Sequence, residues 1–352
     1  MGALLAEMAV NQAPCRAGIL GGPHTRRTRV TPAIVIHAYG GVEQLTLSEI
    51  DLGSPGPGEV LIRHTGIGVN YIDTYFRRGI YPIPLPAVIG DQAVGVVEAL
   101  GPGVSELAEG DTVAYGSVAR AYCERRVIRA DQVVRIPDGV DPDVVAATLT
   151  RAMTAEYLLF RLHAVQPDET VIVHAAVGGT GLLMVQWARH LGARVIATVG
   201  SESKFAAARQ AGADQVLLHQ QDDFVEQVKA MTGGRGVDVV YDSVGKDTFE
   251  KSLECLRRRG LMVAYGNASG KPDPYDVLGL SRLGSLYLTR PRLNDYVAER
   301  AELELSAGRV FEALDAGVLR PHPVKRFALA DAAAAHLHLE DRAELSIPIL
   351  AP

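Results

Sequence analysis

The segment Val171-Ile172-Val173-His174-Ala175-Ala176-Val177-Gly178-Gly179-Thr180-Gly181 reads as a short apolar strand, a glycine-rich turn and the first residue of a helix. It matches the G-x-G-x-x-G dinucleotide-binding pattern, with alanine in place of the first glycine. Tight turns use the same residue types, but the strand before the turn and the helix after it supply the context that the motif requires. Backbone N–H groups in such a turn approach a diphosphate, whose charge is favoured at the positive end of the helix. We therefore predict dinucleotide binding at Gly178, Gly179, Thr180 and Gly181.

The chain after about Thr150 alternates apolar strands with helices. Strands are expected over 171–173, 194–198, 216–218, 237–241 and 260–265, and helices over 181–191, 204–211 and 224–231. Repeated βα units with near-continuous apolar strands favour a parallel sheet covered by helices on both faces. The handedness of the crossovers then predicts a doubly wound, Rossmann-type topology.

The chain before this region shows short strands separated by turns, as in 59–63 after the Gly- and Pro-rich run 53–58. This pattern predicts a compact, mainly antiparallel barrel or sandwich. The tail ends in strand-like 346–350, which we expect to return to the first domain. The predicted domains are 30–152 with 296–352, and an inserted nucleotide domain over 153–295. Residues 1–29 lack periodicity and are expected to be a disordered extension.

Composition narrows the class of protein. The 352 residues suit two domains, with 47% hydrophobic and 22% charged residues, as in a globular protein. A net charge of −6 without a basic cluster argues against nucleic acid or an anionic membrane as main partner. Apolar runs fall short of the ~18 residues needed to span a bilayer. Three distant cysteines suit a reducing compartment, so we expect a cytoplasmic protein.

The end of the second expected strand bears on the choice of cofactor. NAD-preferring enzymes place a carboxylate there for the ribose 2′-hydroxyl, whereas this chain has Val199-Gly200-Ser201 followed by Lys204. An uncharged corner with a nearby cation suits the 2′-phosphate of NADPH. Glu202 opposes this interpretation by its charge, and Lys204 is equally compatible with a solvated position on a helix.

Several segments together resemble a known family, the zinc-independent, zeta-crystallin-like NADPH:quinone oxidoreductases of the medium-chain dehydrogenase/reductase superfamily. The likeness runs in one order from about Ala33 to the C-terminus. It is carried by 68–75 (GVNYIDTY), 79–82 (GIYP), 174–181 (HAAVGGTG), 241–245 (YDSVG), 265–267 (YGN) and 284–291 (GSLYLTRP). The resemblance implies an α/β fold with a GroES-like, mainly-β catalytic domain and an inserted Rossmann domain. It also implies a homodimer.

The resemblance assigns residues to the cofactor as well. It implies that 71–75 lines the nicotinamide side of the cleft and that the other residues form the rest of the NADPH shell. The implied set is Tyr71, Asp73, Thr74, Tyr75, Thr154, Gly178, Gly179, Thr180, Gly181, Ser201, Lys204, Ser243, Asn267, Thr289, Arg290 and Arg342. Two positions depart from the family. His219-Gln220 replaces a Tyr-Arg pair, so His219 is expected to share the phosphate with Lys204. Arg151-Ala152-Met153 replaces Lys-Gly-Leu.

A metal site is not expected. Zinc-dependent relatives use a Cys and the His of a Gly-His-Glu motif, and here the matching places hold the Asn70 region and Gly90-Asp91-Gln92. The chain also lacks the closely spaced cysteines of a structural zinc site. His336 and His338 are two residues apart and do not share a helical face. The cofactor therefore carries the chemistry, and the protein supplies position and electrostatics.

The expected activity is transfer of reducing equivalents from NADPH to a quinone, in one-electron or two-electron steps that the sequence does not separate. Tyr75 and Tyr81 are candidates to shape a flat pocket, and Asn70 or a tyrosine to donate a hydrogen bond to the acceptor. A packing role for the tyrosines is the alternative. A rival activity is reduction of the C=C bond of an enone or alkenal. A rival of another class is an RNA-binding or structural role, known among the resembled family.

Overall fold

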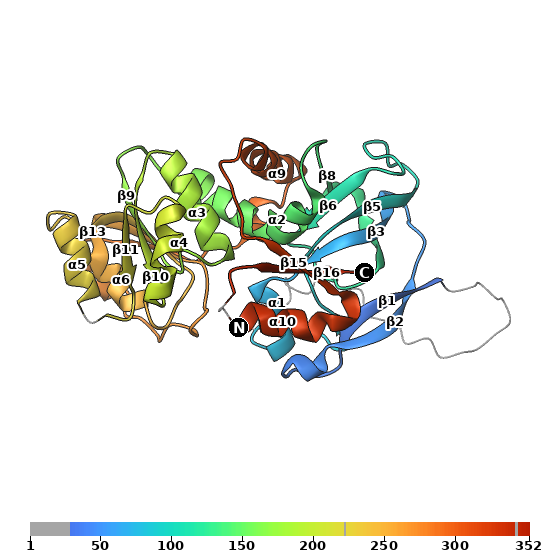
Figure 1. The fold of residues 1–352 in the computed structure, drawn as a ribbon, viewed down its shortest axis with the longest axis horizontal. Coiled ribbons are helices and arrows are strands. Elements are labelled where there is room, and N and C mark those ends of the chain that lie inside the picture. The colour runs from blue at the N-terminus through green and yellow to red at the C-terminus, as the bar shows by residue number, and fades with distance from the viewer. Residues whose placement is uncertain (1–28, 222, 342–343) are drawn as a thin grey trace. The chain divides into compact units, whose positions relative to one another are not determined.

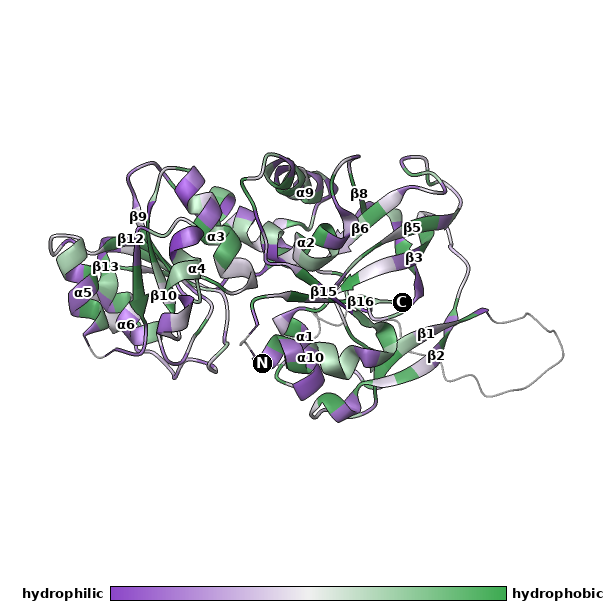
Figure 2. Ribbon diagram, viewed as in Figure 1, coloured by the Kyte–Doolittle hydropathy of each residue, from purple (hydrophilic) through white to green (hydrophobic). Residues whose placement is uncertain are grey.

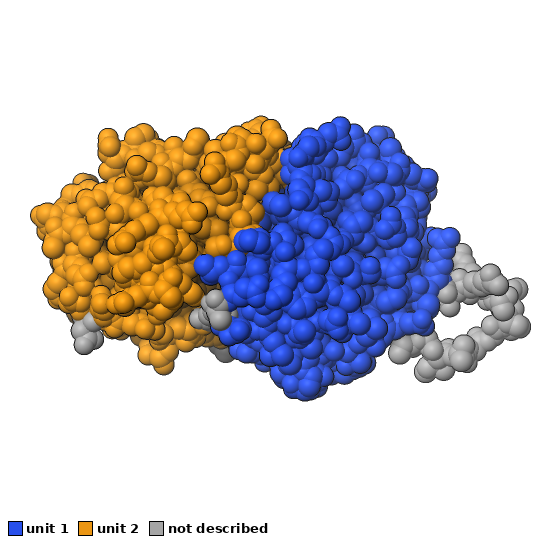
Figure 3. Space-filling model, viewed as in Figure 1, with its two compact units in different colours: residues 1–149, 323–352 blue, residues 150–322 orange. Residues whose placement is uncertain are grey.

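The computed structural model describes residues 29–221, 223–341 and 344–352. The chain divides into two compact units, drawn in different colours in Figure 3. Unit 1 contains the described residues up to Leu149 together with Pro323–Pro352, and unit 2 contains Thr150–His322. The extension expected over 1–29 lies outside the described residues except for Arg29. The interruption of unit 1 by unit 2 is the arrangement expected for an inserted nucleotide domain.

Unit 2 is built on a six-stranded sheet in which every neighbouring pair of strands is parallel. The order is β11-β10-β9-β12-β13-β14, which is the Rossmann order 3-2-1-4-5-6. Figure 1 shows this sheet with helices around it. The strands are β9 (Thr170–Val173), β10 (Arg194–Val199), β11 (Gln215–Leu218), β12 (Val237–Asp242), β13 (Leu256–Ala264) and β14 (Tyr287–Thr289). The predicted doubly wound fold is confirmed.

Helices α3 to α7 lie between these strands in the chain, and α8 and α9 follow the last strand. They are α3 (Gly179–His190), α4 (Phe205–Gln210), α5 (Phe224–Met231), α6 (Phe249–Cys255), α7 (Leu278–Arg282), α8 (Leu293–Tyr296) and α9 (Arg300–Asp315). The helix expected from Lys204 begins instead as a 3-10 turn over Glu202–Lys204. Strand residues such as Val171, Ile172 and Val173 have no exposed surface, because both faces of the sheet are covered. Figure 2 shows the resulting hydrophobic centre of this unit.

Unit 1 contains a three-stranded sheet, β2-β1-β4, and a seven-stranded sheet, β15-β16-β3-β5-β6-β8, in which β7 also pairs with β3. Its strands are β1 (Arg29–Ile36), β2 (Thr46–Leu52), β3 (Glu59–Gly68), β4 (Ala87–Val88), β5 (Gln92–Leu100), β6 (Thr112–Gly116), β7 (Arg125–Arg129), β8 (Val134–Arg135), β15 (Val324–Ala328) and β16 (Ile347–Ala351). All pairs are antiparallel except β15 with β16. The C-terminal strand thus returns to the first domain, as predicted.

The helices of unit 1 are α1 (Tyr71–Arg78) and α10 (Ala332–Asp341), with 3-10 turns over Val42–Gln44, Ala130–Gln132 and Leu329–Asp331. Helix α2 (Pro142–Glu156) runs across the boundary between the units and continues into η4 (Tyr157–Leu162). One apolar cluster fills unit 1 and joins β1, β3 and β5 to residues of α10. Of the helices in the described parts of the chain, none combines the length and apolar character needed to cross a membrane.

The second boundary differs from the one expected from the sequence. Unit 1 resumes at Pro323 rather than at residue 296. The reason is Glu156, which is fully buried and holds α9 within unit 2. Its carboxylate accepts hydrogen bonds from Ser306 at 2.8 Å, Arg309 at 2.7 Å and Arg161 at 2.8 Å. An ion-pair network between such distant residues leaves no periodic pattern in the sequence.

Candidate active site

The predicted cofactor residues of unit 2 gather at one edge of its sheet. Parallel strands end at the same edge, and ligands of open α/β sheets bind outside these carboxyl ends. The residues that follow each strand here are Gly178–Gly181 after β9, Ser201 and Lys204 after β10, His219 after β11, Ser243 after β12, Asn267 after β13, and Thr289 and Arg290 at the end of β14. The topology therefore brings this part of the predicted set together.

The glycines of the turn between β9 and α3 differ in how much space there is for a side chain. A Cβ on Gly181 would overlap the carbonyl oxygen of Ala175, so glycine lets the helix start close to the strand. A Cβ on Gly178 would meet Ala175 alone, with its nearest contact to the carbonyl oxygen at 3.1 Å. Gly178 therefore leaves room above the first turn of α3, whose unpaired N–H groups favour an anion.

Two side chains that the sequence did not point to lie against this turn. A Cβ on Gly179 would lie 2.6 Å from Nε of Arg151, so the buried guanidinium packs directly against the glycine. The imidazole of His322 is 2.8 Å from the carbonyl oxygen of Val177. Arg151 was visible in the sequence only as a departure from the resembled family. His322 carried no local signal, because it lies at the far end of unit 2.

The edge beside β10 and β11 carries the residues expected at a 2′-phosphate. Ser201 and Ser203 share a hydrogen bond of 2.8 Å between their hydroxyls. Nδ1 of His219 lies 3.2 Å from the carbonyl oxygen of Val199, and a Cβ on Gly200 would be 3.7 Å from its Cε1. Burial lowers the pKa of His219, while the Val199 carbonyl and Asp247 act in the opposite direction. Lys204 is half-buried at the end of its 3-10 turn.

The turns after β12 and β13 are ordered by their own hydrogen bonds. Asp242 accepts from the backbone N–H groups of Val244 at 2.7 Å and Gly245 at 3.0 Å. Arg290 donates to the carbonyl oxygens of Ala264 at 2.6 Å and Gly266 at 3.1 Å. The amide of Asn267 fits an orientation in which its oxygen accepts from Arg290 at 3.1 Å. Ser243 is half-buried beside this turn, since a Cβ on Gly266 would overlap its backbone.

One further predicted cofactor residue lies on a helix, and another falls outside the described residues. Thr154 lies on α2, and its hydroxyl donates to the carbonyl oxygen of Thr150 at 2.7 Å. Arg342 lies outside the described residues. The role proposed for each remains a prediction.

In unit 1, Asn70 stands immediately before α1 and meets the residues that replace the zinc-binding motif. Its Nδ2 donates to Asp91 at 2.9 Å and to Gln92 at 3.4 Å. Gln92 in turn donates to the carbonyl oxygen of Ala146. The buried Oδ1 of Asn70 has no hydrogen-bond partner among the described residues. The positions that the sequence analysis matched to the zinc ligands of relatives thus lie together, and here they form a network of amide and carboxylate groups.

A buried chain of hydrogen bonds fixes α1 in place. Asp73 accepts from the backbone N–H of Asn70 at 2.8 Å and from the hydroxyl of Tyr122 at 3.0 Å. Tyr122 is 3.0 Å from Nε2 of His336, whose Nδ1 is 2.9 Å from Arg77. Burial and the nearby Arg77 lower the pKa of His336 to about 3, so the imidazole is neutral near pH 7. Asp73 therefore helps to hold α1 in place within unit 1.

The tyrosines predicted to shape the pocket form one aromatic cluster. Tyr71 and Tyr75 meet edge to face at 5.5 Å, and Tyr75 and Tyr81 at 5.4 Å. The backbone N–H of Tyr81 donates to the Tyr75 carbonyl at 3.4 Å. The hydroxyl of Thr74 is directed to the carbonyl of Tyr71, at 2.7 Å. The hydroxyl of Tyr81 has no hydrogen-bond partner in the described part of the chain.

Other titratable groups do not combine into a metal or nucleophile site. In residues 29–221, 223–341 and 344–352, no three His, Cys, Asp or Glu side chains are placed to hold a metal. His64 and His174 are buried and hydrogen-bonded, as expected of core histidines. Burial raises the pKa of the Cys123 thiol to about 11 and of Cys255 to about 12, so both are inert at neutral pH.

Comparison with known proteins agrees with this architecture. Residues 56–167 match the family described as alcohol dehydrogenase GroES-like domain, and residues 179–299 match that described as zinc-binding dehydrogenase. A 2-haloacrylate reductase of Burkholderia sp is 45% identical over 91% of this chain and 98% of the relative. A quinone oxidoreductase of Salmonella typhimurium is 44% identical over 91% of this chain and 99% of its own length.

A solved structure agrees at the level of the fold. The quinone oxidoreductase of Escherichia coli, complexed with NADPH, superposes with a TM-score of 0.88 at 41% identity, covering 91% of this chain and all of that one. Identity at this level over nearly whole chains, on the same two-unit fold, decides the family. The chain belongs to the quinone oxidoreductase family of the medium-chain dehydrogenase/reductase superfamily.

Proposed function

We propose that this enzyme is an NADPH-dependent reductase of quinones. The observation that carries the proposal is the carboxyl edge of the unit 2 sheet, where a glycine turn, a helix N-terminus and a β10 end followed by Gly200 and Ser201 lie together. Identities of 41% to an E. coli quinone oxidoreductase with bound NADPH and 44% to a Salmonella relative support it. NADPH, when bound, supplies the reducing equivalents.

The residues present fit this cofactor. Gly178 leaves the space that a Cβ would fill, so the backbone is open to a diphosphate. Beside β10, Ser201, Lys204 and His219 supply hydroxyl, ammonium and imidazole donors for a 2′-phosphate. We propose Gly178, Gly179, Thr180 and Gly181 for the diphosphate and Ser201, Lys204 and His219 for the 2′-phosphate. The remaining proposed contacts are Tyr71, Asp73, Thr74, Tyr75, Thr154, Ser243, Asn267, Thr289, Arg290 and Arg342.

For the acceptor, we propose the cluster of Tyr75 and Tyr81 together with Asn70. A quinone is flat and its carbonyl oxygen gains negative charge on reduction, so it suits aromatic walls and one hydrogen-bond donor. The Nδ2 of Asn70 is committed to Asp91 and Gln92, which leaves Oδ1 as an acceptor. The hydroxyl of Tyr81 is therefore the better donor to a quinone oxygen.

The test is steady-state oxidation of NADPH with a benzoquinone, a naphthoquinone, an enone, 2-chloroacrylate and a saturated ketone at matched concentrations. We expect a quinone to be the fastest acceptor, because it needs neither a metal nor a strong acid to polarise its oxygen. A saturated ketone as the best acceptor would refute the proposal.

A second candidate function is reduction of a C=C bond conjugated to a carbonyl group. It is favoured by the 45% identity to a 2-haloacrylate reductase. If 2-chloroacrylate or the enone reacted faster than the quinones, this second candidate would be the better assignment. The proposed cofactor would be unaffected.

We also propose that the enzyme works without metal, as a homodimer in the cytoplasm. Strand β14 is an edge strand, and its Tyr287 and Leu288 are 60% and 39% exposed, which suits pairing with the same strand of a second copy. Light scattering at micromolar concentration tests the dimer. Metal analysis of the pure enzyme, with activity measured before and after chelation, tests whether activity requires a metal.

A further inference from the structure

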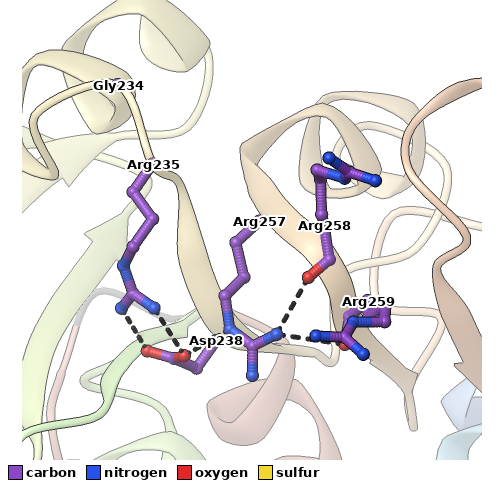
Figure 4. Close-up of a pocket in the computed structure, with 6 residues that line it drawn as sticks. All are labelled: Gly234, Arg235, Asp238, Arg257, Arg258 and Arg259. Atoms are coloured by element: carbon purple, nitrogen blue, oxygen red, sulfur yellow. Dashed lines mark hydrogen bonds and ion pairs between the residues drawn. The ribbon is translucent and has the colours of Figure 1, made fainter.

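Four arginines surround a cavity at the opposite edge of the unit 2 sheet, where the strands begin. The cavity has a volume of about 570 Å³ and is lined by Gly234, Arg235, Asp238, Arg257, Arg258 and Arg259 (Figure 4). We call it the arginine pocket. It is distinct from the glycine turn, which lies at the carboxyl edge. A cavity lined by four arginines and one aspartate is unexpected in a chain of net charge −6.

The single carboxylate of the arginine pocket is fully used. Asp238 binds Arg235 through both oxygens, at 3.0 and 2.7 Å, and Nε of Arg257 at 2.5 Å. It also accepts from the backbone N–H of Thr170 at 2.9 Å. Burial alone would raise the pKa of Asp238, but these contacts together outweigh burial and lower the pKa to about 2, so the carboxylate remains ionised. Arg235 and Arg257 thus have a structural role, and Asp238 has no capacity left to neutralise a third arginine.

The other two arginines project from a bulge in β13. Val237 of β12 pairs with Leu256, but Val239 pairs with Leu261, so 257–260 bulge out of the ladder. Arg259 has a φ of 57° in the left-handed region, which is costly for a residue with a side chain. A regular strand would direct consecutive side chains to opposite faces, whereas here all three arginines border one cavity.

Arg258 and Arg259 carry charge that the described residues do not balance. Both are exposed, and neither has an ion-pair partner in residues 29–221, 223–341 and 344–352. Arg257 helps to hold their backbone, since its Nη1 donates to the carbonyl oxygens of Arg258 at 2.9 Å and Arg259 at 3.3 Å. Helices α5 and α6 end shortly before Arg235 and Arg257 in the chain, and a helix C-terminus favours a cation. Arg235 and Arg257 can supply that positive charge without Arg258 and Arg259.

We propose that the arginine pocket is a second ligand site, which binds a small phosphorylated anion of diphosphate size. Guanidinium groups bind phosphate oxygens in pairs, and their fork geometry matches tetrahedral oxyanions better than an ammonium does. The volume lies in the range of small-molecule sites. Asp238 and Arg257 hold the site in shape, and Arg258 and Arg259 supply the uncompensated charge.

The test is calorimetric titration of the NADPH-saturated enzyme with inorganic pyrophosphate at low ionic strength, so that the glycine turn is already occupied. We expect one saturable site per chain. The double variant Arg258→Ala/Arg259→Ala should weaken pyrophosphate binding by at least about tenfold, because two charge-assisted contacts are lost. Both side chains are exposed, so the variant should keep the wild-type melting temperature.

A control with the same change in charge is Arg209→Ala/Arg282→Ala, which removes two exposed arginines elsewhere in unit 2. It should change pyrophosphate affinity by no more than about twofold, which separates a built site from general attraction. Absence of saturable binding by the wild type, or an equal loss in the control, would overturn the proposal. Affinity for NADPH is measured in a separate titration, so a failure of the proposed cofactor would be seen independently.

Discussion

Substitution of two glycines three residues apart should have opposite effects on stability and cofactor binding. A Cβ on Gly181 would lie roughly 1 Å inside the 3.4 Å of an ordinary contact with the Ala175 carbonyl oxygen. Neither backbone segment can yield as a flexible side chain would, so Gly181→Ala should cost about 1–3 kcal/mol, as overpacking does. For a unit of this size, this corresponds to a fall in melting temperature of about 2–4 °C per kcal/mol.

Gly178→Ala is the matched variant in the same turn. Gly178 has φ −73° and ψ 168°, which alanine adopts without strain, and its Cβ would have 3.1 Å to the nearest atom. We expect a loss of stability of at most about 1 kcal/mol, because the Cβ would lie only roughly 0.3 Å inside an ordinary contact and alanine adopts this backbone conformation without strain. NADPH affinity should nevertheless fall by at least about tenfold, because the methyl group occupies the space where the diphosphate approaches.

The assay is thermal unfolding of the cofactor-free enzyme, followed by an NADPH titration monitored by fluorescence. Gly181→Ala should lower the melting temperature and also weaken NADPH, because the start of α3 must move. If Gly178→Ala were the more destabilised of the two, or bound NADPH like the wild type, the assignment of the two glycines would be refuted.

Three further predictions concern charge and pH. Lys204→Ala should raise the KM for NADPH by roughly ten- to hundredfold and leave that for NADH unchanged; equal effects would place Lys204 away from the phosphate. Because burial lowers the pKa of His219 and a bound phosphate favours its protonated form, the NADPH-to-NADH affinity ratio should fall as pH rises from about 6 to 8. His219→Gln should flatten that profile, and a profile identical to the wild type would exclude His219. Burial also lowers the pKa of His64 and His336 to about 3 and of His174 to about 4, so the unfolded chain takes up protons first below about pH 6.5. Each should then cost about 2 kcal/mol of stability at pH 5, and urea midpoints that do not fall between pH 7 and 5 would contradict this.

The sequence was sufficient for the parts of the fold that local patterns encode. The strand 171–173, the glycine turn and the helix after it are neighbours in the chain, so apolar periodicity and glycine placement predicted them. The carboxyl edge followed from topology, because parallel strands bring their ends together. The return of 346–350 to unit 1 was also predicted, from its strand-like composition and the family resemblance.

Features made by distant residues were not predicted. The boundary near Pro323 depends on Glu156, whose partners Ser306 and Arg309 lie about 150 positions away. His322 reaches Val177 across a similar separation. Neither contact produces a motif, since an isolated glutamate or histidine looks the same whether it is solvated or buried. The bulge at Arg259 likewise depends on a register shift that composition does not reveal.

Strand β16 pairs with β15 on one side and with β3 on the other. Its partner in β3, Gly68, is made early in translation, whereas Ile349 is made after the whole of unit 2. Until β16 is made, the seven-stranded sheet lacks its end strands β15 and β16, and Ile67 and Gly68 of β3 have no partner on that side. Unit 2 has all its strands on the nascent chain before β15 and β16 are made. The usual order of N-terminal domain first therefore cannot be completed here, because unit 1 gains its last two strands only after the whole of unit 2 has been made.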